Sequence, residues 1–518
     1  MTTTAQPTTA ETSPAADRAS SRVPRTVDVV VVGGGSAAET AGPRAAAAGL
    51  SVVVVEASLV GGECPFWACV PSKAMLLAGH AHRAGGSTDH DAAWSWALQR
   101  RREATAGLDD SGKVRGLADA GVELVRGWAE VERSPGGGGL VRVRRGASGP
   151  DDGPDDGPDD GAGEVEEIGW RTLVVATGST PSAPPVDGLE DVPTWTSDEA
   201  LTSDHRPASL VVLGGGAVGC ELSQVYASFG VRTTLVETTP RLLASEQPSV
   251  GEAVEQALAG SGVDVRTGVT ASRARTGGDG VVLELDDGSE VTGERVLLAS
   301  GRRPRLECVQ TQGLDVTDAG ALAVDDRYRV LADGQPLDDV YAVGDVNGRA
   351  PYTHGANYQA RVVADALTGH PRAGDETGMP RAVYTEPSVL ATGLTAEGAR
   401  DAGHEVVVAV QASHDTGRAH VERYDGPGTV ELVVDAGTGV LLGASAVGPE
   451  ADSWGGELVL AVRARLTVEL LAEVVHPFPA WGELLLPAAE SARDQVRERR
   501  GELPRPTQGA AEPAHAAG

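Results

Sequence analysis

The sequence is poor in cysteine, aromatic residues and lysine. Its 518 residues include four cysteines, and only 3% are Phe, Trp or Tyr. So few cysteines in a chain of this length exclude a fold that depends on a disulfide framework. Lys73 and Lys113 are the two lysines, and arginine provides the other 41 of the 43 basic side chains. A lysine in so arginine-rich a sequence is a mild indication of a special role.

Long apolar runs and positive charge are also missing. No run of about 18 apolar residues occurs, so no segment is predicted to span a membrane. The 74 acidic and 43 basic residues leave a net charge of −31, which repels phosphate backbones and anionic lipids. We therefore expect neither nucleic acid nor membrane as a partner. The first 25 residues lack the apolar core of a secretory signal, which predicts a disordered tail and a cytoplasmic protein.

The chain is long enough for about three to four domains, which can bury their cores without a structural metal. We expect no metal site. A GGGG run, a short strand-like stretch LVRVRR and the tract DDGPDDGPDDG mark residues 133–163 as a largely low-complexity insert. Cys220 and Cys308 stand alone and are expected to be packed as small apolar residues. Towards the C-terminus, residues 406–410, 430–434 and 441–447 predict antiparallel strands, and 453–466 and 483–497 predict helices.

Two segments of the chain repeat one pattern, at residues 27–56 and 210–237. Each has an apolar run, a glycine-rich turn, a helical stretch and a second apolar run that ends on an acid, 23 residues after the first glycine. Such a unit binds a dinucleotide because the turn admits a pyrophosphate to the helix N-terminus and the acid accepts hydrogen bonds from a ribose. We therefore predict two adenine dinucleotides. The contacts are Gly33, Gly35, Ala38 and Glu56 in the first unit and Gly214, Gly216, Gly219 and Glu237 in the second.

The second acid indicates which nicotinamide dinucleotide is used. Glu237 would hydrogen-bond a free 2′-hydroxyl and repel a 2′-phosphate, which favours NADH over NADPH. Arg241 is a counter-indication, because a guanidinium suits a 2′-phosphate. Glu39 is unusual beside a pyrophosphate, and we expect it to face away from the phosphates.

Cys64 and Cys69 stand five residues apart in GGECPFWACVPSK, residues 61–73. A Pro-Ser pair just after Cys69 indicates a helix start, and a thiol at a helix N-terminus is stabilised as the thiolate. Lys73, one turn further on, adds a positive charge. The segment offers too few ligands for zinc. The two interpretations are a pair of packed cysteines and a redox-active disulfide, and we favour the disulfide.

This segment closely resembles the active-site segment of the class I FAD-dependent pyridine nucleotide–disulfide oxidoreductases, which include dihydrolipoamide dehydrogenase and mercuric reductase. Within residues 26–495, further motifs agree in order: TLVVATG, VLLASGRRP, VYAVGDV, YTHGANYQA and YTEP. The resemblance implies an α/β chain with two Rossmann-like domains, for FAD and NAD, and a C-terminal α+β dimerisation domain. The implied boundaries are a tail at 1–25, FAD-binding segments at 26–200 and 325–375, an NAD(P)-binding domain at 201–324, a dimerisation domain at 376–499 and a tail at 500–518.

The resemblance also implies roles for single residues. Lys73 would pair with Glu221 beside the flavin, Cys69 would face the flavin, and Cys64 would exchange with the acceptor. Electrons would pass from NADH to FAD, to the Cys64–Cys69 disulfide and on to a small acceptor. The helix that begins near His354 would direct its N-terminus at the flavin, although a structural role is the alternative for His354 and Tyr358. The other implied contacts are Gly62, Lys73, Thr177, Gly178 and Asp345 for FAD and Gly301 for NAD.

The resemblance fails at one position near the C-terminus. The family carries a His-x-His-Pro-x-x-x-Glu pattern, supplied by the partner subunit of a homodimer, and its second histidine exchanges a proton with the thiol. Here residues 476–483 are HPFPAWGE, so Phe478 replaces that histidine and Glu483 is kept. A phenyl ring cannot accept a proton. His476 is either a substitute base or an ordinary loop histidine.

The missing histidine leaves three functions open. The first is a dihydrolipoamide dehydrogenase-like enzyme that reduces a disulfide or a related small acceptor. The second is an NAD(P)H:quinone or metal reductase that uses the flavin directly, which Phe66, Trp67 and Phe478 favour because they add aromatic surface to the two active-site segments. The third is a flavoprotein redox sensor without turnover, and the intact cysteine pair and Lys73 argue against it.

Overall fold

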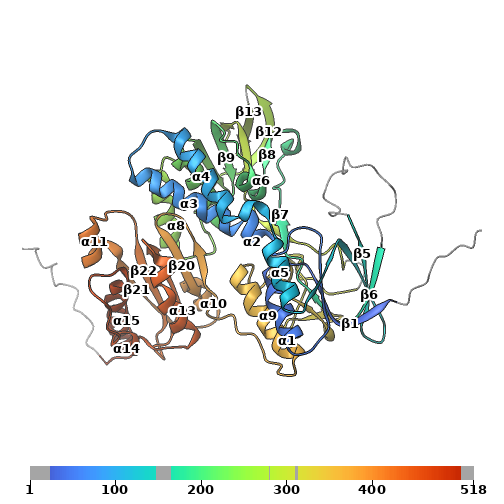
Figure 1. The fold of residues 1–518 in the computed structure, drawn as a ribbon. Coiled ribbons are helices and arrows are strands. Elements are labelled where there is room, and N and C mark those ends of the chain that lie inside the picture. The colour runs from blue at the N-terminus through green and yellow to red at the C-terminus, as the bar shows by residue number, and fades with distance from the viewer. Residues whose placement is uncertain (1–23, 147–164, 279, 310–312, 503–518) are drawn as a thin grey trace, which may run out of the picture.

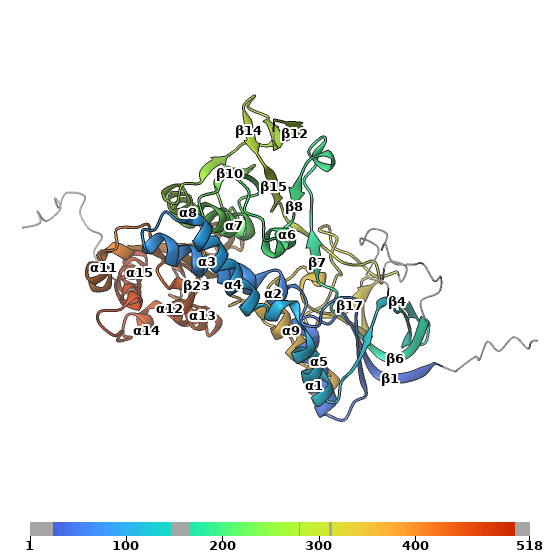
Figure 2. The same ribbon diagram turned by 45° about the horizontal axis from the view of Figure 1, so that its top comes forward.

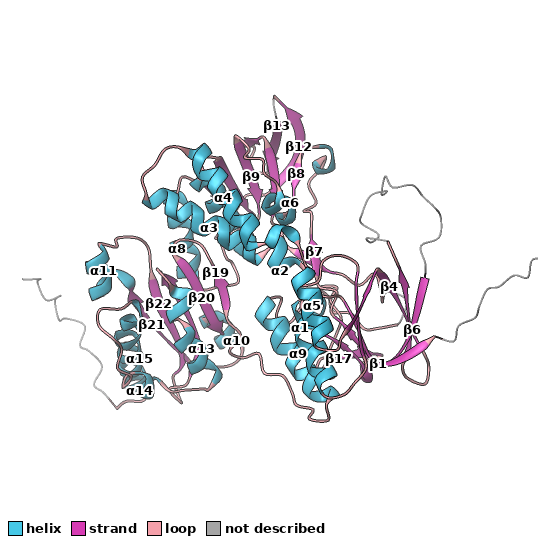
Figure 3. Cartoon of the chain, in the orientation of Figure 1, coloured by secondary structure: helices cyan, strands magenta, loops and turns pink. Residues whose placement is uncertain are grey.

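Three groups of strands and helices make up the chain in a computed structural model, which describes residues 24–146, 165–278, 280–309 and 313–502 (Figures 1 and 2). The aspartate-rich tract of the predicted insert and nearly all of the two predicted tails lie outside these residues. Helices and strands occur in all three groups (Figure 3). Within the described ranges, no helix combines the length and the apolar character that crossing a bilayer requires.

Valine-rich strands build the sheet of the first group. β1 pairs in parallel with β2 on one side and with β6 on the other, so Val29 to Val32 lie in the middle of the sheet. β18 pairs with β6, so a segment far along the chain completes this sheet. Its eight strands are β1 (Arg25–Val32), β2 (Val52–Glu56), β3 (Glu123–Arg126), β4 (Trp128–Arg133), β5 (Gly139–Arg144), β6 (Val165–Val175), β17 (Arg329–Ala332) and β18 (Gln335–Ala342).

The two faces of this sheet are covered by different elements, because successive strand residues point to opposite sides. Val29 and Val31 face a core shared with three helices, α1 (Ser36–Ala47), α5 (Ser111–Asp119) and α9 (Thr353–Leu367), which lie together in Figure 1. Val30 and Val32 face a second core, to which strands β4 and β5 contribute. β5 lies inside the predicted insert and is a regular strand between β4 and β6.

The second group contains a five-stranded sheet whose strands are all parallel. Its strands are β8 (Thr194–Trp195), β9 (Ser209–Leu213), β10 (Arg232–Glu237), β11 (Asp264–Thr267) and β15 (Arg295–Leu298), with helices α6 (Ser197–Thr202), α7 (Ala217–Ser228) and α8 (Pro248–Gly260). β8 lies before the predicted boundary at residue 201 but pairs with β15. A two-residue strand shows too little periodicity to be found in a sequence.

Two small antiparallel sheets accompany the second group. One consists of β12 (Ala271–Gly277), β13 (Gly280–Leu285) and β14 (Glu290–Gly293). The other pairs β7 (Ser179–Pro181) with β16 (Arg302–Pro304). This last pair lies where the chain passes between the first two groups, so it places the residues just after TLVVATG beside the last residues of VLLASGRRP.

The third group is a five-stranded antiparallel sheet with helices, and it confirms the predicted C-terminal strands. The strands are β19 (Arg381–Val383), β20 (Ser388–Gly393), β21 (Val406–Ala412), β22 (Thr429–Asp435) and β23 (Leu441–Gly448). The helices are α10 (Ala396–Asp401), α11 (Gly417–Glu422), α12 (Ala451–Trp454), α13 (Gly456–Arg463), α14 (Val468–Leu471) and α15 (Leu485–Arg499). Ala488, Ala492 and Val496 of α15 are buried in the core of this group.

Two helices of the N-terminal half leave the first group and pack on the second. They are α3 (Cys69–Ala84) and α4 (His90–Ala104), which follow the short helix α2 (Glu63–Phe66). The ring of Trp94 on α4 lies 5.8 Å from that of Tyr226 on α7 and 5.3 Å from that of Phe229, between ring centroids. Helix α3, which carries Cys69 and Lys73 in its first turns, also packs against α7.

Candidate active site

The two glycine-rich turns have the same geometry. In the first, the N–H of Gly34 donates to the Glu56 carboxylate at 2.5 Å. In the second, the N–H of Gly215 donates to the Glu237 carboxylate at the same distance. Gly33 and Gly214 both have a positive φ, and a β-carbon at either would lie within 2.4 Å of a carbonyl oxygen of the neighbouring strand end. Neither position therefore tolerates a side chain, and each acid is held beside its turn.

A cavity of about 910 Å³ runs from the first turn to the cysteine pair. It brings together most of the residues predicted for FAD and for electron transfer. Those that line it are Gly33, Gly35, Glu56, Gly62, Cys64, Cys69, Lys73, Thr177, Gly178, Glu221, Asp345 and His354. The residues predicted for NAD, as well as Ala38, His476 and Glu483, do not line this cavity. Ala38 is fully buried in the core behind the turn.

Helix α3 begins at Cys69, which confirms the predicted helix start. Both cysteines are free thiols, and the Cys69 sulfur lies 3.6 Å from the Thr353 hydroxyl. The Cys64 thiol hydrogen-bonds to Cys69, and with Thr353 and the positive charge of Lys73 it lowers the pKa of Cys69 to about 6, against the opposing effect of burial. The same shared hydrogen bond raises the pKa of Cys64. The reduced pair therefore carries its negative charge on Cys69.

Lys73 and Glu221 form the predicted ion pair, with 2.7 Å between Nζ and the carboxylate. The Glu221 side chain is only 8% exposed. Its second carboxylate oxygen accepts the backbone N–H of Tyr384 at 2.9 Å, and the Tyr384 ring centroid lies 4.4 Å from Lys73 Nζ. The motif that contains Tyr384 indicated only family membership. The sequence therefore did not predict that Tyr384 contacts the Lys73–Glu221 pair.

Polar residues that the sequence did not indicate surround Asp345. The Ser179 hydroxyl donates to the Asp345 carboxylate at 2.6 Å, and Arg302 Nε donates to Ser179 at 2.8 Å. Arg302 also pairs with Glu63, whose pKa is raised by burial to about 7 despite the arginine. Because Ser179 and Arg302 lie on the paired strands β7 and β16, their contact depends on a pairing that no local pattern predicts.

Helix α9 begins at Thr353, beside the cysteine pair, as predicted for the helix near His354. The His354 ring lies against Tyr352, with 5.2 Å between centroids, and its Nε2 is 2.8 Å from the Pro380 carbonyl oxygen. Tyr358 accepts the N–H of Asp375 through its hydroxyl at 2.7 Å. These contacts favour a structural role for His354 and Tyr358. His354 also lines the cavity, so its predicted contact with the flavin stays a prediction.

The unusual Glu39 faces Lys113 and not the turn, with 2.8 Å between Nζ and the carboxylate. The Lys113 stem lies over Gly61, where a β-carbon would be 2.6 Å from it. Gly61 in turn bridges to Gly35 in parallel fashion. The second lysine of the chain therefore packs the first glycine turn against the loop that leads to Cys64.

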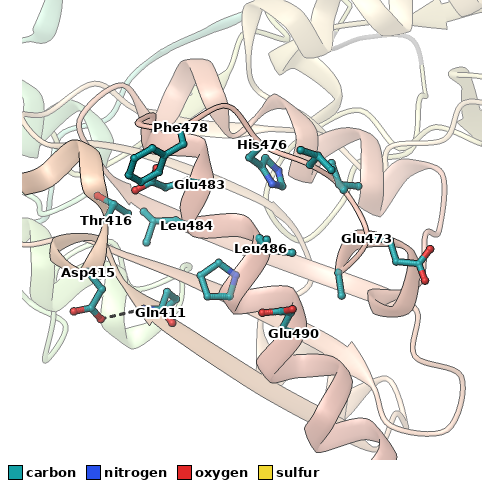
Figure 4. Close-up of a pocket in the computed structure, with 14 residues that line it drawn as sticks. Gln411, Asp415, Thr416, Glu473, His476, Phe478, Glu483, Leu484, Leu486 and Glu490 are labelled. Atoms are coloured by element: carbon teal, nitrogen blue, oxygen red, sulfur yellow. Dashed lines mark hydrogen bonds between the residues drawn. The ribbon is translucent and has the colours of Figure 1, made fainter.

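The C-terminal segment places its three predicted residues differently. Phe478 is 79% exposed, whereas the His476 side chain is 7% exposed, with Nε2 at 3.1 Å from Glu457. The Glu483 carboxylate accepts the N–H groups of Gly417 and Ala480. Figure 4 shows Phe478 beside Glu483 at one end of a pocket of about 520 Å³, with His476 further along it. Phe478 therefore projects from this segment, and the His476 side chain does not.

The chemistry of these residues fits FAD and a nicotinamide dinucleotide. The first glycine of each turn leaves no room for a β-carbon, and a carboxylate accepts a backbone N–H of each turn. The first turn opens into a cavity that also contains the cysteine pair. No group of three or more His, Cys, Asp or Glu side chains suited to a metal ion occurs within the described part of the chain.

Comparison with known proteins agrees with this geometry. Residues 27–360 match the family described as pyridine nucleotide-disulphide oxidoreductase, and residues 379–489 match its dimerisation domain. The chain is 33% identical to the dihydrolipoyl dehydrogenase of Haloferax volcanii, covering 90% of this chain and 97% of that enzyme, and 30% identical to a mercuric reductase of Shigella flexneri, covering 91% and 81%. A solved Cu(II) complex of the flavoprotein disulfide reductase RclA from Escherichia coli superposes with a TM-score of 0.77 at 25% identity, covering 90% and 99%. These matches confirm the predicted fold class.

Proposed function

This chain belongs to the pyridine nucleotide-disulphide oxidoreductase family, and we propose that it passes electrons from NADH through FAD and the Cys64–Cys69 pair to a disulfide or a related small acceptor. It is an enzyme that uses FAD and NAD(P)H. The observation that carries the proposal is one cavity that contains the first glycine turn, the cysteine pair and the Lys73–Glu221 ion pair.

Each residue of the cysteine pair has a distinct task in this proposal. FAD, when bound, supplies two-electron transfer between the nicotinamide and the cysteines. A hydride equivalent reduces the disulfide to one thiol and one thiolate, and the charge lies on Cys69 because its pKa is about 6. Cys64, once deprotonated, attacks a disulfide acceptor and releases its first thiolate. Cys69 then attacks Cys64, releases the second thiolate and restores the disulfide.

NADH is the nicotinamide dinucleotide that the second turn supports. Glu237 accepts the N–H groups of Gly215 and Thr239, so its negative charge is held at the turn. Arg241 donates to the carbonyl oxygens of Leu243, Ala244 and Glu246. Since its guanidinium is engaged with the backbone, Arg241 is poorly placed to bind a 2′-phosphate.

A homodimer is part of the proposal, because the family match includes a dimerisation domain. The partner chain would bring its Phe478 towards the cysteine pair, since this residue projects from its own chain. The small-molecule acceptor and the cytoplasmic location remain predictions, which substrate screening and cell fractionation can check.

An anaerobic titration with NADH tests the electron path. We expect the first equivalent to leave the flavin oxidised and to produce a long-wavelength charge-transfer band from the Cys69 thiolate to the flavin. Immediate bleaching of the flavin without this band would contradict the cysteine relay. A protein purified without flavin colour that does not bind added FAD would contradict the cofactor assignment as well.

Direct reduction of a quinone or a metal ion by the flavin is the second candidate function. The observation that favours it is that Phe478, which is 79% exposed, takes the place of the histidine that disulfide reduction would require. The names of two relatives, a mercuric reductase and a Cu(II) complex of RclA, make metal ions worth including in the screen. A redox sensor without turnover is not supported, because the named relatives are enzymes.

The variant Phe478→His separates the two candidates. If the absence of a proton acceptor limits disulfide reduction, the new imidazole should raise the rate by about tenfold or more. The rate with a quinone should change little, because that route needs no thiol deprotonation. Steady-state assays with both acceptors on the same preparation give the ratio of the disulfide rate to the quinone rate. An unchanged ratio would argue that proton transfer to residue 478 does not matter.

A further inference from the structure

Tyr384 belongs to the third group of elements but is attached firmly to helix α7 of the second. Its backbone N–H donates to Glu221 at 2.9 Å. Two residues further on, the N–H of Glu386 donates to the Gln224 side-chain oxygen at 2.7 Å, and the Gln224 amide donates back to the Glu386 carbonyl at 2.9 Å. Gln224 is fully buried. The backbone around Tyr384 is therefore held at three points along one face of α7.

This attachment places an aromatic face over the Lys73 ammonium. Nζ lies 4.4 Å from the Tyr384 ring centroid, 2.7 Å from the Glu221 carboxylate and 3.3 Å from the Ser72 hydroxyl. An ammonium at this distance is attracted by the negative face of the ring. The ring covers one side of the ammonium, and the Lys73 side chain is 30% exposed.

The same ring lies at the cavity that contains the cysteine pair. Tyr384, Cys64 and Cys69 all line it. Burial raises the pKa of the Tyr384 hydroxyl, followed by the negative charges of Asp452 and Glu221 and then of the two cysteines. Lys73 is one of the groups that lower the pKa of Cys69. The size of this effect on the Cys69 pKa depends on how close the Lys73 ammonium is held to the cysteine pair.

We propose that Tyr384 is a positioning residue, whose ring holds the Lys73 ammonium beside the cysteine pair, so that the C-terminal domain stabilises the Cys69 thiolate within its own chain. This inference rests on the proposed cysteine relay. It adds a role for a residue outside both nucleotide-binding domains, and it makes the placement of that domain a determinant of thiolate stability.

The test is the pH dependence of the Cys69 thiolate at constant ring size. The full-length holoenzyme is prepared with Phe, 3,4,5-trifluorophenylalanine or pentafluorophenylalanine in place of Tyr384, and also as Tyr384→Leu. Fluorine withdraws the negative charge from the ring face without removing the ring. Two readouts are followed between pH 5 and 9: the thiolate-to-flavin charge-transfer band, and alkylation of Cys69 by iodoacetamide, located by mass spectrometry.

We expect the midpoint to lie near pH 6 in the parent protein and in Tyr384→Phe, because both present an unsubstituted face. It should rise stepwise with fluorination and by about half a pH unit in Tyr384→Leu. The sign follows because a weaker hold on the cation stabilises the thiolate less, so deprotonation needs a higher pH. FAD content and melting temperature serve as the folding control.

Coinciding midpoints across the phenylalanine series would overturn the inference, even if catalytic rates differ, because a purely structural role would change the rate and not the thiolate. If Tyr384→Leu does not fold, the fluorinated series still decides. Absence of the band in the parent protein would overturn the cysteine relay itself. The two failures are therefore distinguishable.

Discussion

Replacing Cys69 by serine is expected to lower NADH-dependent disulfide reduction by about 10³-fold or more. Serine cannot form the internal disulfide, so a mixed disulfide on Cys64 has no resolving partner. The serine hydroxyl also cannot carry the negative charge that the hydrogen bonds and Lys73 stabilise on Cys69. The long-wavelength band should disappear in the same variant, and both effects are measured on one preparation.

The acceptor used in the assay makes this result decisive. Under the second candidate function, Cys69→Ser should keep quinone reduction within a few-fold of the parent rate, because the flavin then transfers electrons directly. Cys220→Ser is a suitable control, since Cys220 is a fully buried free thiol that does not line the cavity. Undiminished disulfide reduction in Cys69→Ser would contradict the relay.

Alanine at the two equivalent glycines should separate the two nucleotide sites. In Gly33→Ala the new methyl group would lie 2.3 Å from the Ala176 carbonyl oxygen, and in Gly214→Ala it would lie 2.4 Å from that of Ala299. Both positions also have a positive φ, which strains alanine. We expect Gly33→Ala to bind FAD, and Gly214→Ala to bind NADH, roughly 10²-fold more weakly. Flavin fluorescence and NADH titration measure the two affinities.

The control for backbone strain is Gly262→Ala. Gly262 also has a positive φ, but no atom lies within 4 Å of the position that a β-carbon would take. This variant should keep both affinities. If Gly214→Ala loses its flavin together with NADH binding, the second turn supports the whole fold and not one nucleotide, and the assignment of separate sites would be wrong.

Local patterns were sufficient for the elements that repeat a short period. The two valine- and leucine-rich strands with their glycine turns, and the C-terminal strands at 406–412, 429–435 and 441–448, are where alternation and turn residues predict them. The two-residue strand β8 was missed, which moves one predicted boundary. Hydrophobic periodicity carries no information over two residues.

The residues of the candidate site also divide into those that local sequence predicts and those that only the fold brings together. The sequence by itself determined the residues whose chemistry is local: the glycines of each turn, the acid 23 residues later, and a cysteine at a helix start followed by lysine. The family resemblance also predicted that Lys73 meets Glu221. Only the tertiary structure decided that Arg302 and Tyr384 reach the cavity, the first through pairing of β7 with β16 and the second through its attachment to α7. It also decided that Phe478 projects while the His476 side chain is buried. Side-chain exposure and contacts across domains depend on the sum of many weak packing energies, and no single segment of sequence contains that sum.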